Sequence, residues 1–364
     1  MKKSAKIMAV ALAVLAAVPV NAAFTYDNAT QILTDGVWTF EGIGLAKDGV
    51  SMTVRGSQAT KKPDVPSKLD FSDVKDSSGK SLKVAMLGVF EGLNVSEVIA
   101  PDCTAFTGQN CFYNCKDLKK VVLAEDFGNL GGARAFSGCT SLEEFSPRIL
   151  QVNGVTGSAF ASCSKLPGSF VLPKCTSVGK HAFSDCALLE SVSAPLVDEI
   201  LEGAFSGCES MSVFCFEAKA EAIEKEAFAE ISPGALLYMH AEPPETIGSI
   251  FVGNLKAPFT KVVLKDNYDA WLNKIAETHY VVRKEEFNNR DMAFDGKTWN
   301  WAFVAGKMGG DTEMCSVAAD KTVSVKAKGV LAFVLEKSGD KQAANLSSFW
   351  VLKAPKSGFA IKVR

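Results

Sequence analysis

Ten cysteines and three histidines are the side chains with which this 364-residue chain could bind a metal ion or attack a substrate. The histidines are His181, His240 and His279, and none stands in the H-x-x-x-H spacing of a zinc site. The acidic pairs Glu143-Glu144 and Glu285-Glu286 would point to opposite faces of a strand, a poor geometry for shared acid–base catalysis. No G-x-S-x-G nucleophile motif is present. The sequence therefore predicts no catalytic, metal-binding or cofactor-binding residues.

Half of the cysteines recur at a regular interval, in the motif F-x-x-C-x-x-[LM]. The copies begin 22 to 24 residues apart, at Phe112, Phe136, Phe160, Phe183 and Phe205. A degenerate sixth copy begins at Phe228, with Ile231 in the position of the cysteine. A near-constant period of this length is typical of solenoids, in which each repeat buries its apolar side against its neighbours. The sequence therefore predicts a stack of similar coils.

The residues between the motifs indicate what each coil contains. The leucine is followed by an alternating segment, as in Leu118-x-x-Val121-x-Leu123, which predicts a strand with one face in the core. Proline ends this strand in three coils, at Pro147, Pro173 and Pro195. Small residues precede each phenylalanine, and four copies carry an apolar residue five positions before it, namely Val155, Val178, Ile200 and Ile223. The predicted fold is a parallel, single-sheet β-solenoid with short helical or irregular returns.

The repeated cysteines occupy one position per coil and have three possible roles. They are Cys115, Cys139, Cys163, Cys186 and Cys208. Neighbouring Cα atoms would lie at about the 4.8 Å coil spacing, which a disulfide tolerates, but parallel side chains disfavour its torsion near ±90°. Metal binding is the third role. Because buried cysteine behaves as a small apolar residue, the favoured role is a ladder in the core. Cys103 and Cys175 share another position three coils apart, about 14 Å, too far to bond.

These motifs resemble the BspA-type leucine-rich repeat, whose form is A-F-x-x-C-x-x-L-x-x-V-x-[LI]-P-x-x-[IV]. The resemblance extends over residues 83–282, where Tyr238–Pro244 is similar to the step after the last coil and Lys261–Trp271 to a closing strand and helix. The asparagine ladder of ordinary leucine-rich repeats is absent. The resemblance implies a bacterial or protozoan surface protein that acts in adhesion or cell contact, and it does not imply an enzyme.

The first 22 residues have the three parts of a secretory signal peptide. Lysines precede the apolar run Ile7–Val18, and Val20-Asn21-Ala22 is a small-x-small cleavage site. The run is shorter than the ~20 residues that span a bilayer, and no later segment is apolar enough. The sequence predicts export to the medium or the cell surface, with no membrane span after cleavage. The formal net charge of −2 gives no indication of a nucleic-acid partner.

Two regions flank the repeats. Residues 23–82 alternate like strands and end in a polar stretch, which predicts a short β-rich cap and a loop, with Leu69-Asp70-Phe71 starting the array. Residues 289–364 lack the repeat and predict a small antiparallel β-domain. Its expected strands are Trp299–Phe303, Thr322–Lys328, Val330–Leu335 and Phe359–Val363.

The candidate binding residues are the strand positions that alternate with core residues and therefore point outward. They are expected to form one continuous stripe of Lys119, Lys120, Val122, Glu143, Glu144, Ser146, Ser191, Ser193 and Cys215. The leading hypothesis is a binding protein that uses this stripe to contact a protein or glycan at a cell surface or matrix. Two alternatives remain: a structural envelope spacer without a specific ligand, and a hydrolytic enzyme with its site in residues 289–364.

Overall fold

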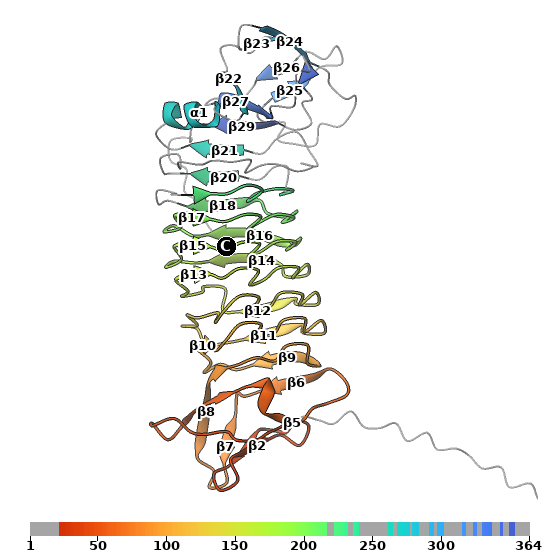
Figure 1. The fold of residues 1–364 in the computed structure, drawn as a ribbon, viewed down its shortest axis with the longest axis vertical. Helices are drawn as coiled ribbons and strands as arrows, with labels where there is room; N and C mark the ends of the chain where they lie inside the picture. Colours follow the sequence, from red (N-terminus) through yellow and green to blue (C-terminus); the bar gives the residue numbers. More distant parts are fainter. Residues whose placement is uncertain are drawn as a thin grey trace, which may run out of the picture.

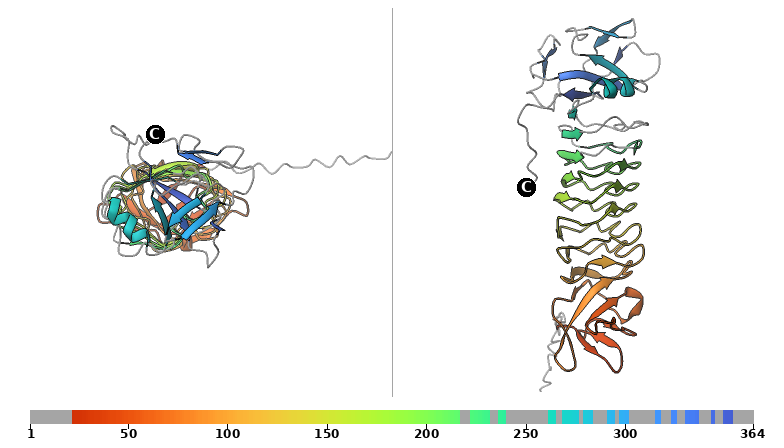
Figure 2. Two further views of the ribbon diagram at one scale, coloured as in Figure 1. Left: turned by 90° about the horizontal axis from the view of Figure 1, so that it is seen from above. Right: turned by 90° about the vertical axis from the view of Figure 1, so that its left-hand side faces the viewer.

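The computed structural model is an elongated stack of coils, with the N-terminal sheet at one end (Figures 1 and 2). It describes residues 22–216, 222–231, 236–239, 261–264, 268–276, 279–283, 291–294, 297–301, 315–317, 323–325, 330–336, 343–344 and 349–353. Side chains are described for residues 22–215, 223–231 and 268–276. The predicted signal peptide before Ala22, the Pro243-Pro244 step and the strand at 359–363 lie outside the described residues.

An eight-stranded sheet forms the N-terminal end. Its strands are β1 (Thr25–Asp27), β2 (Ile32–Thr34), β3 (Thr39–Phe40), β4 (Ser51–Val54), β5 (Ala59–Lys61), β7 (Val74–Asp76), β8 (Ser81–Leu87) and β10 (Ala105–Phe106), with a 3-10 turn at Gly56–Gln58. Phe24 stacks on Phe71 at 4.7 Å, and Trp38 stacks on Phe40 at 6.0 Å. Phe40 in turn meets Phe90 edge-on at 6.1 Å, so the aromatic core of this sheet continues into the repeats.

The repeats form a parallel solenoid, as predicted. We call the side of the coils that carries the longer strands the strand face, and it is divided between two sheets. The first contains β6 (Ser67–Asp70), β9 (Val95–Ile99), β11 (Lys120–Val122) and β12 (Glu144–Ser146), all paired in parallel. The second begins with β14 (Gly168–Val171), β16 (Leu189–Ser193), β18 (Val213–Phe216), β20 (Leu236–Met239) and β21 (Lys261–Leu264). A third sheet of short strands runs along another side of the coils: β13 (Gly154–Val155), β15 (Ser177–Val178), β17 (Glu199–Ile200) and β19 (Ala222–Ile223).

The C-terminal part of the chain continues the second sheet. β21 pairs in parallel with β29 (Phe349–Lys353), followed by β27 (Val330–Glu336) and β22 (His279–Arg283) in antiparallel pairs. The remaining elements are α1 (Tyr268–Ala276), β23 (Asp291–Phe294), β24 (Lys297–Trp301), β25 (Cys315–Val317), β26 (Val323–Val325) and β28 (Ala343–Ala344). No helix within the described ranges is long and apolar enough to cross a membrane.

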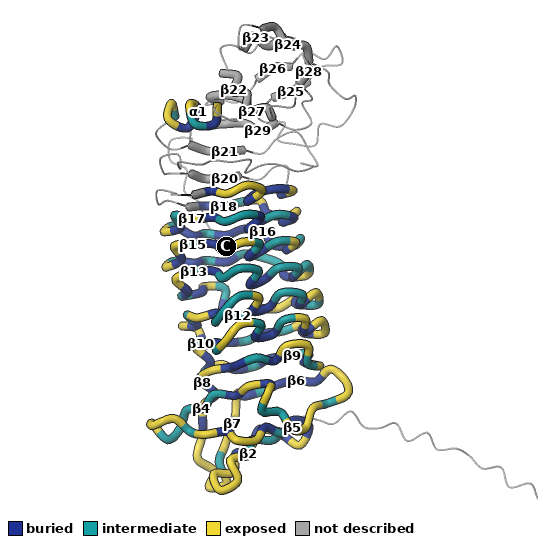
Figure 3. Tube along the Cα trace, viewed as in Figure 1, coloured by how far each residue is buried: buried dark blue, intermediate teal, exposed yellow. Residues whose placement is uncertain are grey.

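A ladder of stacked phenylalanine rings runs through the coils. It consists of Phe90, Phe112, Phe136, Phe160, Phe183, Phe205 and Phe228, all fully buried. Centroids of successive rings lie 5.2 to 5.5 Å apart, and their planes differ by only 3° to 15°. Offset stacking of this kind adds about 0.5–1.5 kcal/mol per pair beyond the burial of apolar area. Figure 3 shows buried segments recurring at the same place in each coil.

The repeated cysteines form a second ladder beside the rings, and each thiol has a hydrogen-bond acceptor. Cys139 Sγ donates to the carbonyl oxygen of Phe112 at 3.1 Å, and Cys163 Sγ donates to that of Phe136 at 3.2 Å. Cys115, Cys186 and Cys208 make the same bond to their preceding coils. None of the nine cysteines with described side chains forms a disulfide, so the ladder is the role that the structure supports among the three considered.

The cysteine ladder is expected to resist alkylation while the protein is folded. Burial raises the pKa of Cys115 to about 12 and also raises the pKa of Cys139 well above its ordinary value, so at pH 8 the reactive thiolate is scarce. Iodoacetamide at pH 8 should leave the five repeat cysteines unmodified in the native protein. In denaturant without reductant it should modify all five, as read by peptide mass spectrometry. Recovery of disulfide-linked repeat peptides would contradict the ladder.

Candidate binding surface

The first sheet presents a row of alternating charges on its outer face. Strand register places Lys68 beside Glu97, Glu97 beside Lys120, and Lys120 beside Glu144. The Nζ of Lys68 lies 4.0 Å from Glu97, and that of Lys120 lies 2.7 Å from Glu144. The Glu144 carboxylate raises the pKa of Lys120 because it stabilises the ammonium form. We call Lys68, Glu97, Lys120 and Glu144 the charge row.

A second outer row lies beside the charge row. It runs through Asp70, Ile99, Val122 and Ser146, again by direct strand register. Lys119 and Glu143 precede their strands and are exposed, and Glu143 pairs with Lys165 at 3.2 Å. The structure therefore gathers six of the predicted binding residues, from Lys119 to Ser146, on one sheet. The same sheet also carries Lys68 and Glu97, which sequence reasoning missed. Both alternate with buried residues of β6 and β9, and this pattern could have identified them.

The other three predicted residues lie on the second sheet, so the expected continuous stripe is divided. Ser191 pairs with Ser169 and Val213, while Ser193 pairs with Val171 and Cys215. The Ser191 hydroxyl donates to the Ser169 hydroxyl at 2.6 Å. Apart from the exposed Glu190, the described side chains on β14, β16 and β18 are hydroxyl-bearing or apolar, in contrast to the charge row.

The expectation that Cys215 is solvent-exposed is wrong, because the side chain is only 7% exposed. Its strand is interior to the second sheet, with β16 on one side and β20 on the other. Cys215 is in register with Ser193 and with Tyr238, and a short side chain between two paired strands has little access to solvent. Alternation alone placed it on the outer face without showing what flanks it.

The strand face is interrupted between β12 and β14, which do not pair. Instead, the Val171 N–H donates to the carbonyl of Arg148 at 2.9 Å, and the Leu150 N–H donates to the carbonyl of Val171 at 3.0 Å. A bulge at Gly168 and Ser169 shifts the register of β14 against β16. Leu166 and Phe170 are four residues apart, whereas Leu142 and Phe145 of the coil before are three apart. This extra residue accounts for the altered pairing.

A hollow of about 330 Å³ lies over the first sheet next to this interruption. It is lined by Lys120, Val121, Val122, Glu143, Glu144, Phe145, Ser146 and Arg148. Seven of these eight residues are among the predicted binding residues or directly between them. Sequence reasoning missed Arg148, although it occupies the position that proline fills in the next two coils, at Pro173 and Pro195.

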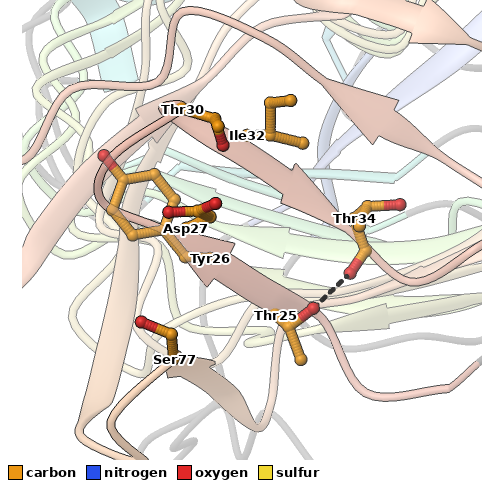
Figure 4. A pocket seen from close by; sticks show the side chains of 7 residues that line it. All are labelled: Thr25, Tyr26, Asp27, Thr30, Ile32, Thr34 and Ser77. Carbon is orange, nitrogen blue, oxygen red and sulfur yellow. Dashed lines mark hydrogen bonds between the residues drawn. The ribbon is translucent and has the colours of Figure 1, made fainter.

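A second hollow, of about 370 Å³, lies in the N-terminal sheet. Figure 4 shows its lining: Thr25, Tyr26, Asp27, Thr30, Ile32, Thr34 and Ser77. Its polar atoms already serve the local structure, since Thr25 Oγ1 donates to the carbonyl of Thr34 at 3.3 Å, and Asp27 Oδ1 accepts the Ala29 N–H at 2.8 Å. Thr34 Oγ1 likewise donates to the carbonyl of Trp38 at 2.6 Å. The hollow on the strand face is therefore the better candidate site.

No group of three or more histidine, cysteine, aspartate or glutamate side chains in the described part of the chain is arranged to hold a metal ion. The acidic pair Glu143-Glu144 is divided between two lysines, Lys165 and Lys120, at 3.2 and 2.7 Å. Both carboxylates thus have cationic partners of their own.

Comparison with known proteins gives a family for the repeats. The family model described as "BspA type Leucine rich repeat region" matches residues 80–188 and 156–249, in six copies. A search of curated proteins found no match. A solved leucine-rich repeat protein of T. pallidum is 24% identical over 49% of this chain and 80% of its own, with a TM-score of 0.37. A leucine rich cell surface protein of Faecalibacterium prausnitzii A2-165 is 16% identical over 65% of this chain and 85% of its own, with a TM-score of 0.34.

The family match begins just before β8 and ends beyond the sixth repeat, so it spans the coils that carry the phenylalanine and cysteine ladders. Over residues 80–249, the chain therefore contains repeats that match the BspA-type leucine-rich repeat family.

Proposed function

We propose that this chain is an exported binding protein that contacts a protein or glycan partner at a cell surface through its strand face. The observation that carries the proposal is the charge row, in which four strands present lysine and glutamate in strict alternation. A spacer needs length and a core, and neither requires a patterned outer face. A rigid array of strands can bind with little loss of conformational entropy, because its surface is ordered before the partner arrives.

Export and surface location are parts of the same proposal. The support for export is the pattern of residues 1–22, with its lysines, apolar run and small-x-small site. Lys119, Lys120, Val122, Glu143, Glu144 and Ser146 are the proposed contact residues, with Lys68 and Glu97 added. Ser193 remains a proposed contact on the second sheet, where it is separated from the others by the interruption. The expectation that Ser191 is solvent-exposed is wrong, because it is only 9% exposed, so it is not among the proposed contacts.

The charge row can be inverted without removing its ion pairs if Asp70, which pairs with Lys68 at 2.8 Å, is inverted with it. The variant Lys68→Glu, Asp70→Lys, Glu97→Lys, Lys120→Glu, Glu144→Lys keeps opposite charges beside each other, so the melting temperature should stay within a few degrees of the parent. Attachment to cells or to extracellular matrix should fall about tenfold or more, because the partner now meets charges of the wrong sign. Attachment is measured by surface plasmon resonance on matrix-coated chips or by cell adhesion.

A matched control exists on another side of the coils. Glu202 pairs with Lys180 at 2.7 Å and with Lys225 at 3.0 Å, so inverting these three residues exchanges the charges of two ion pairs away from the strand face. This control should leave attachment unchanged. Attachment that survives inversion of the charge row, but is lost on deleting residues 289–364, would place the binding site in the C-terminal part and make the solenoid a spacer.

A further inference from the structure

The hollow on the strand face contains an arginine that lacks the partners its charge requires. Arg148 follows β12, and its guanidinium lies over the ring of Phe170, with the Cζ atom 5.0 Å from the ring centroid. The Nη1 atom is enclosed and has no hydrogen-bond partner, and Arg148 makes no ion pair within the described part of the chain. Buried or half-buried arginine is normally paired, since the guanidinium carries five donors and a permanent charge.

The backbone at Arg148 is held by hydrogen bonds, so its side chain extends from a fixed point. The carbonyl of Arg148 accepts the N–H of Val171, and Ile149 forms an isolated parallel bridge with Val171. Ala124, Pro173 and Pro195 fill the equivalent position in other coils and carry no charge. Arg148 is therefore a feature of this one coil, at the one place where the strand face is interrupted.

Charges around the hollow favour a ligand with a single negative charge. Glu143 and Glu144 are neutralised by Lys165 and Lys120, which leaves Arg148 as the lining cation without a paired carboxylate. Burial lowers the pKa of Arg148, whereas the charge of Glu190 raises it without forming an ion pair with the guanidinium. The planar fork of a guanidinium matches a carboxylate in two parallel hydrogen bonds. A doubly charged phosphate would meet more repulsion from Glu143 and Glu144 than a carboxylate does.

The rest of the lining suits a ligand rich in hydroxyl groups. Glu143 and Glu144 can accept hydrogen bonds, Lys120 can donate them, and Ser146 can do both. The volume of about 330 Å³ is at the small end of the range for small-molecule pockets, roughly 300–1,000 Å³. We propose that this hollow binds an acidic sugar residue, with Arg148 pairing with the sugar carboxylate. The proposal rests on the proposed binding function and specifies the chemistry of its ligand.

Free sugars test this site directly. Ligand-observed NMR titration of the full chain should detect binding of D-glucuronate, with D-glucose at least ten times weaker because it lacks the carboxylate. Acetate and inorganic phosphate serve as competitors, and neither should displace glucuronate at equal concentration. Displacement by acetate would overturn the sugar part of the proposal, and displacement by phosphate would overturn the choice of a carboxylate.

Variants of Arg148 assign the interaction to this residue. Arg148→Gln should weaken glucuronate binding about tenfold or more, to the level of glucose, and Arg148→Lys should restore only part of it because the planar fork is lost. Neither should lower the melting temperature much, since Gln removes a poorly solvated charge. The matched control is Arg134→Gln, because Arg134 also lies over a ring, that of Tyr113 at 5.5 Å, outside the hollow.

Equal binding of glucose and glucuronate, or unchanged binding by Arg148→Gln, would overturn the proposal, as would an equal loss in Arg134→Gln. The binding function is tested separately. If inversion of the charge row abolishes attachment while Arg148→Gln still binds glucuronate as the parent does, the binding function stands and the acidic-sugar site fails. If Arg148→Gln loses glucuronate while charge-row inversion leaves attachment intact, the sugar site stands without the wider role of the strand face.

Discussion

Replacing Phe183 with alanine is expected to lower the free energy of unfolding by about 3–5 kcal/mol. The Phe183 ring is fully buried and is stacked between Phe160 at 5.2 Å and Phe205 at 5.5 Å. Truncation removes both stacking contacts and leaves a cavity. The neighbouring rings cannot collapse into it easily, because each is held by its own partner on the far side. Urea unfolding followed by far-UV circular dichroism measures the loss.

Pairs of substitutions separate a stacked ladder from independent buried rings. Phe160→Ala and Phe183→Ala remove rings that touch, so their effects should depart from additivity by about 0.5 kcal/mol or more. Phe112→Ala and Phe205→Ala remove rings that are several coils apart, so their effects should add. Additive losses in both pairs would show that the rings contribute by burial alone.

The solenoid could be predicted from the sequence because its core positions are periodic. A single spacing set the coil length, the phenylalanine ladder and the cysteine ladder together. The coil that contains Phe90 falls within the predicted repeats at 83–282, but its copy of the motif was not recognised because Leu93 stands where the motif has cysteine. Phe90 nevertheless stacks on Phe112 as closely as the later rings stack on one another. Leucine fills the same space as the cysteine without a thiol. The sequence motif is therefore lost in this coil, although the stacking of the rings is kept.

The division of the strand face could not be predicted, because it depends on pairing and not on side-chain type. The extra residue between Leu166 and Phe170 is visible in the sequence, but several backbone paths could absorb it. The structure places the bulge at Gly168 and pairs Val171 with the segment after Pro147. This backbone path places Arg148 over the ring of Phe170. The outer position of Cys215 followed from alternation, whereas its burial follows from β20, which lies beyond the last clear strand motif.

Left-handed backbone positions are a second feature that the motif did not predict. Two occur in each coil from Phe112 to Phe228, two residues before and two residues after the phenylalanine. They include Asn110 and Asn114, Ser158 and Ser162, and Gly203 and Gly207. Their backbone N–H groups point to the next coil, as in Asn114 to Ser137 at 2.9 Å and Ser162 to Ser184 at 2.7 Å. The return side of the coils is thereby joined by hydrogen bonds of its own, and close contacts between coils are common there.

Replacing Gly131 with alanine is expected to cost more than its backbone conformation alone explains. Gly131 has a φ of +73°, which costs a residue with a Cβ about 1–2 kcal/mol. An added Cβ would also lie 2.4 Å from the carbonyl oxygen of Gly108 in the preceding coil, a backbone atom that cannot rotate away. That oxygen accepts the N–H of Gly132 at 2.7 Å, so relief of the clash would weaken a bond between coils. Overpacking of this kind typically adds about 1–3 kcal/mol.

Gly92 supplies the control, because its φ of +65° is similar and an added Cβ meets nothing within 4 Å. Gly92→Ala should therefore show only the backbone cost, and the difference between the two variants in urea unfolding should be about 1–3 kcal/mol. Native-state hydrogen exchange at Gly132 should rise in Gly131→Ala and stay unchanged in Gly92→Ala, since only the first strains the bond to Gly108. Equal losses of stability in the two variants would mean that the coils can move apart at Gly108 with no cost in free energy. The close contact at Gly108 would then not determine the spacing of the coils.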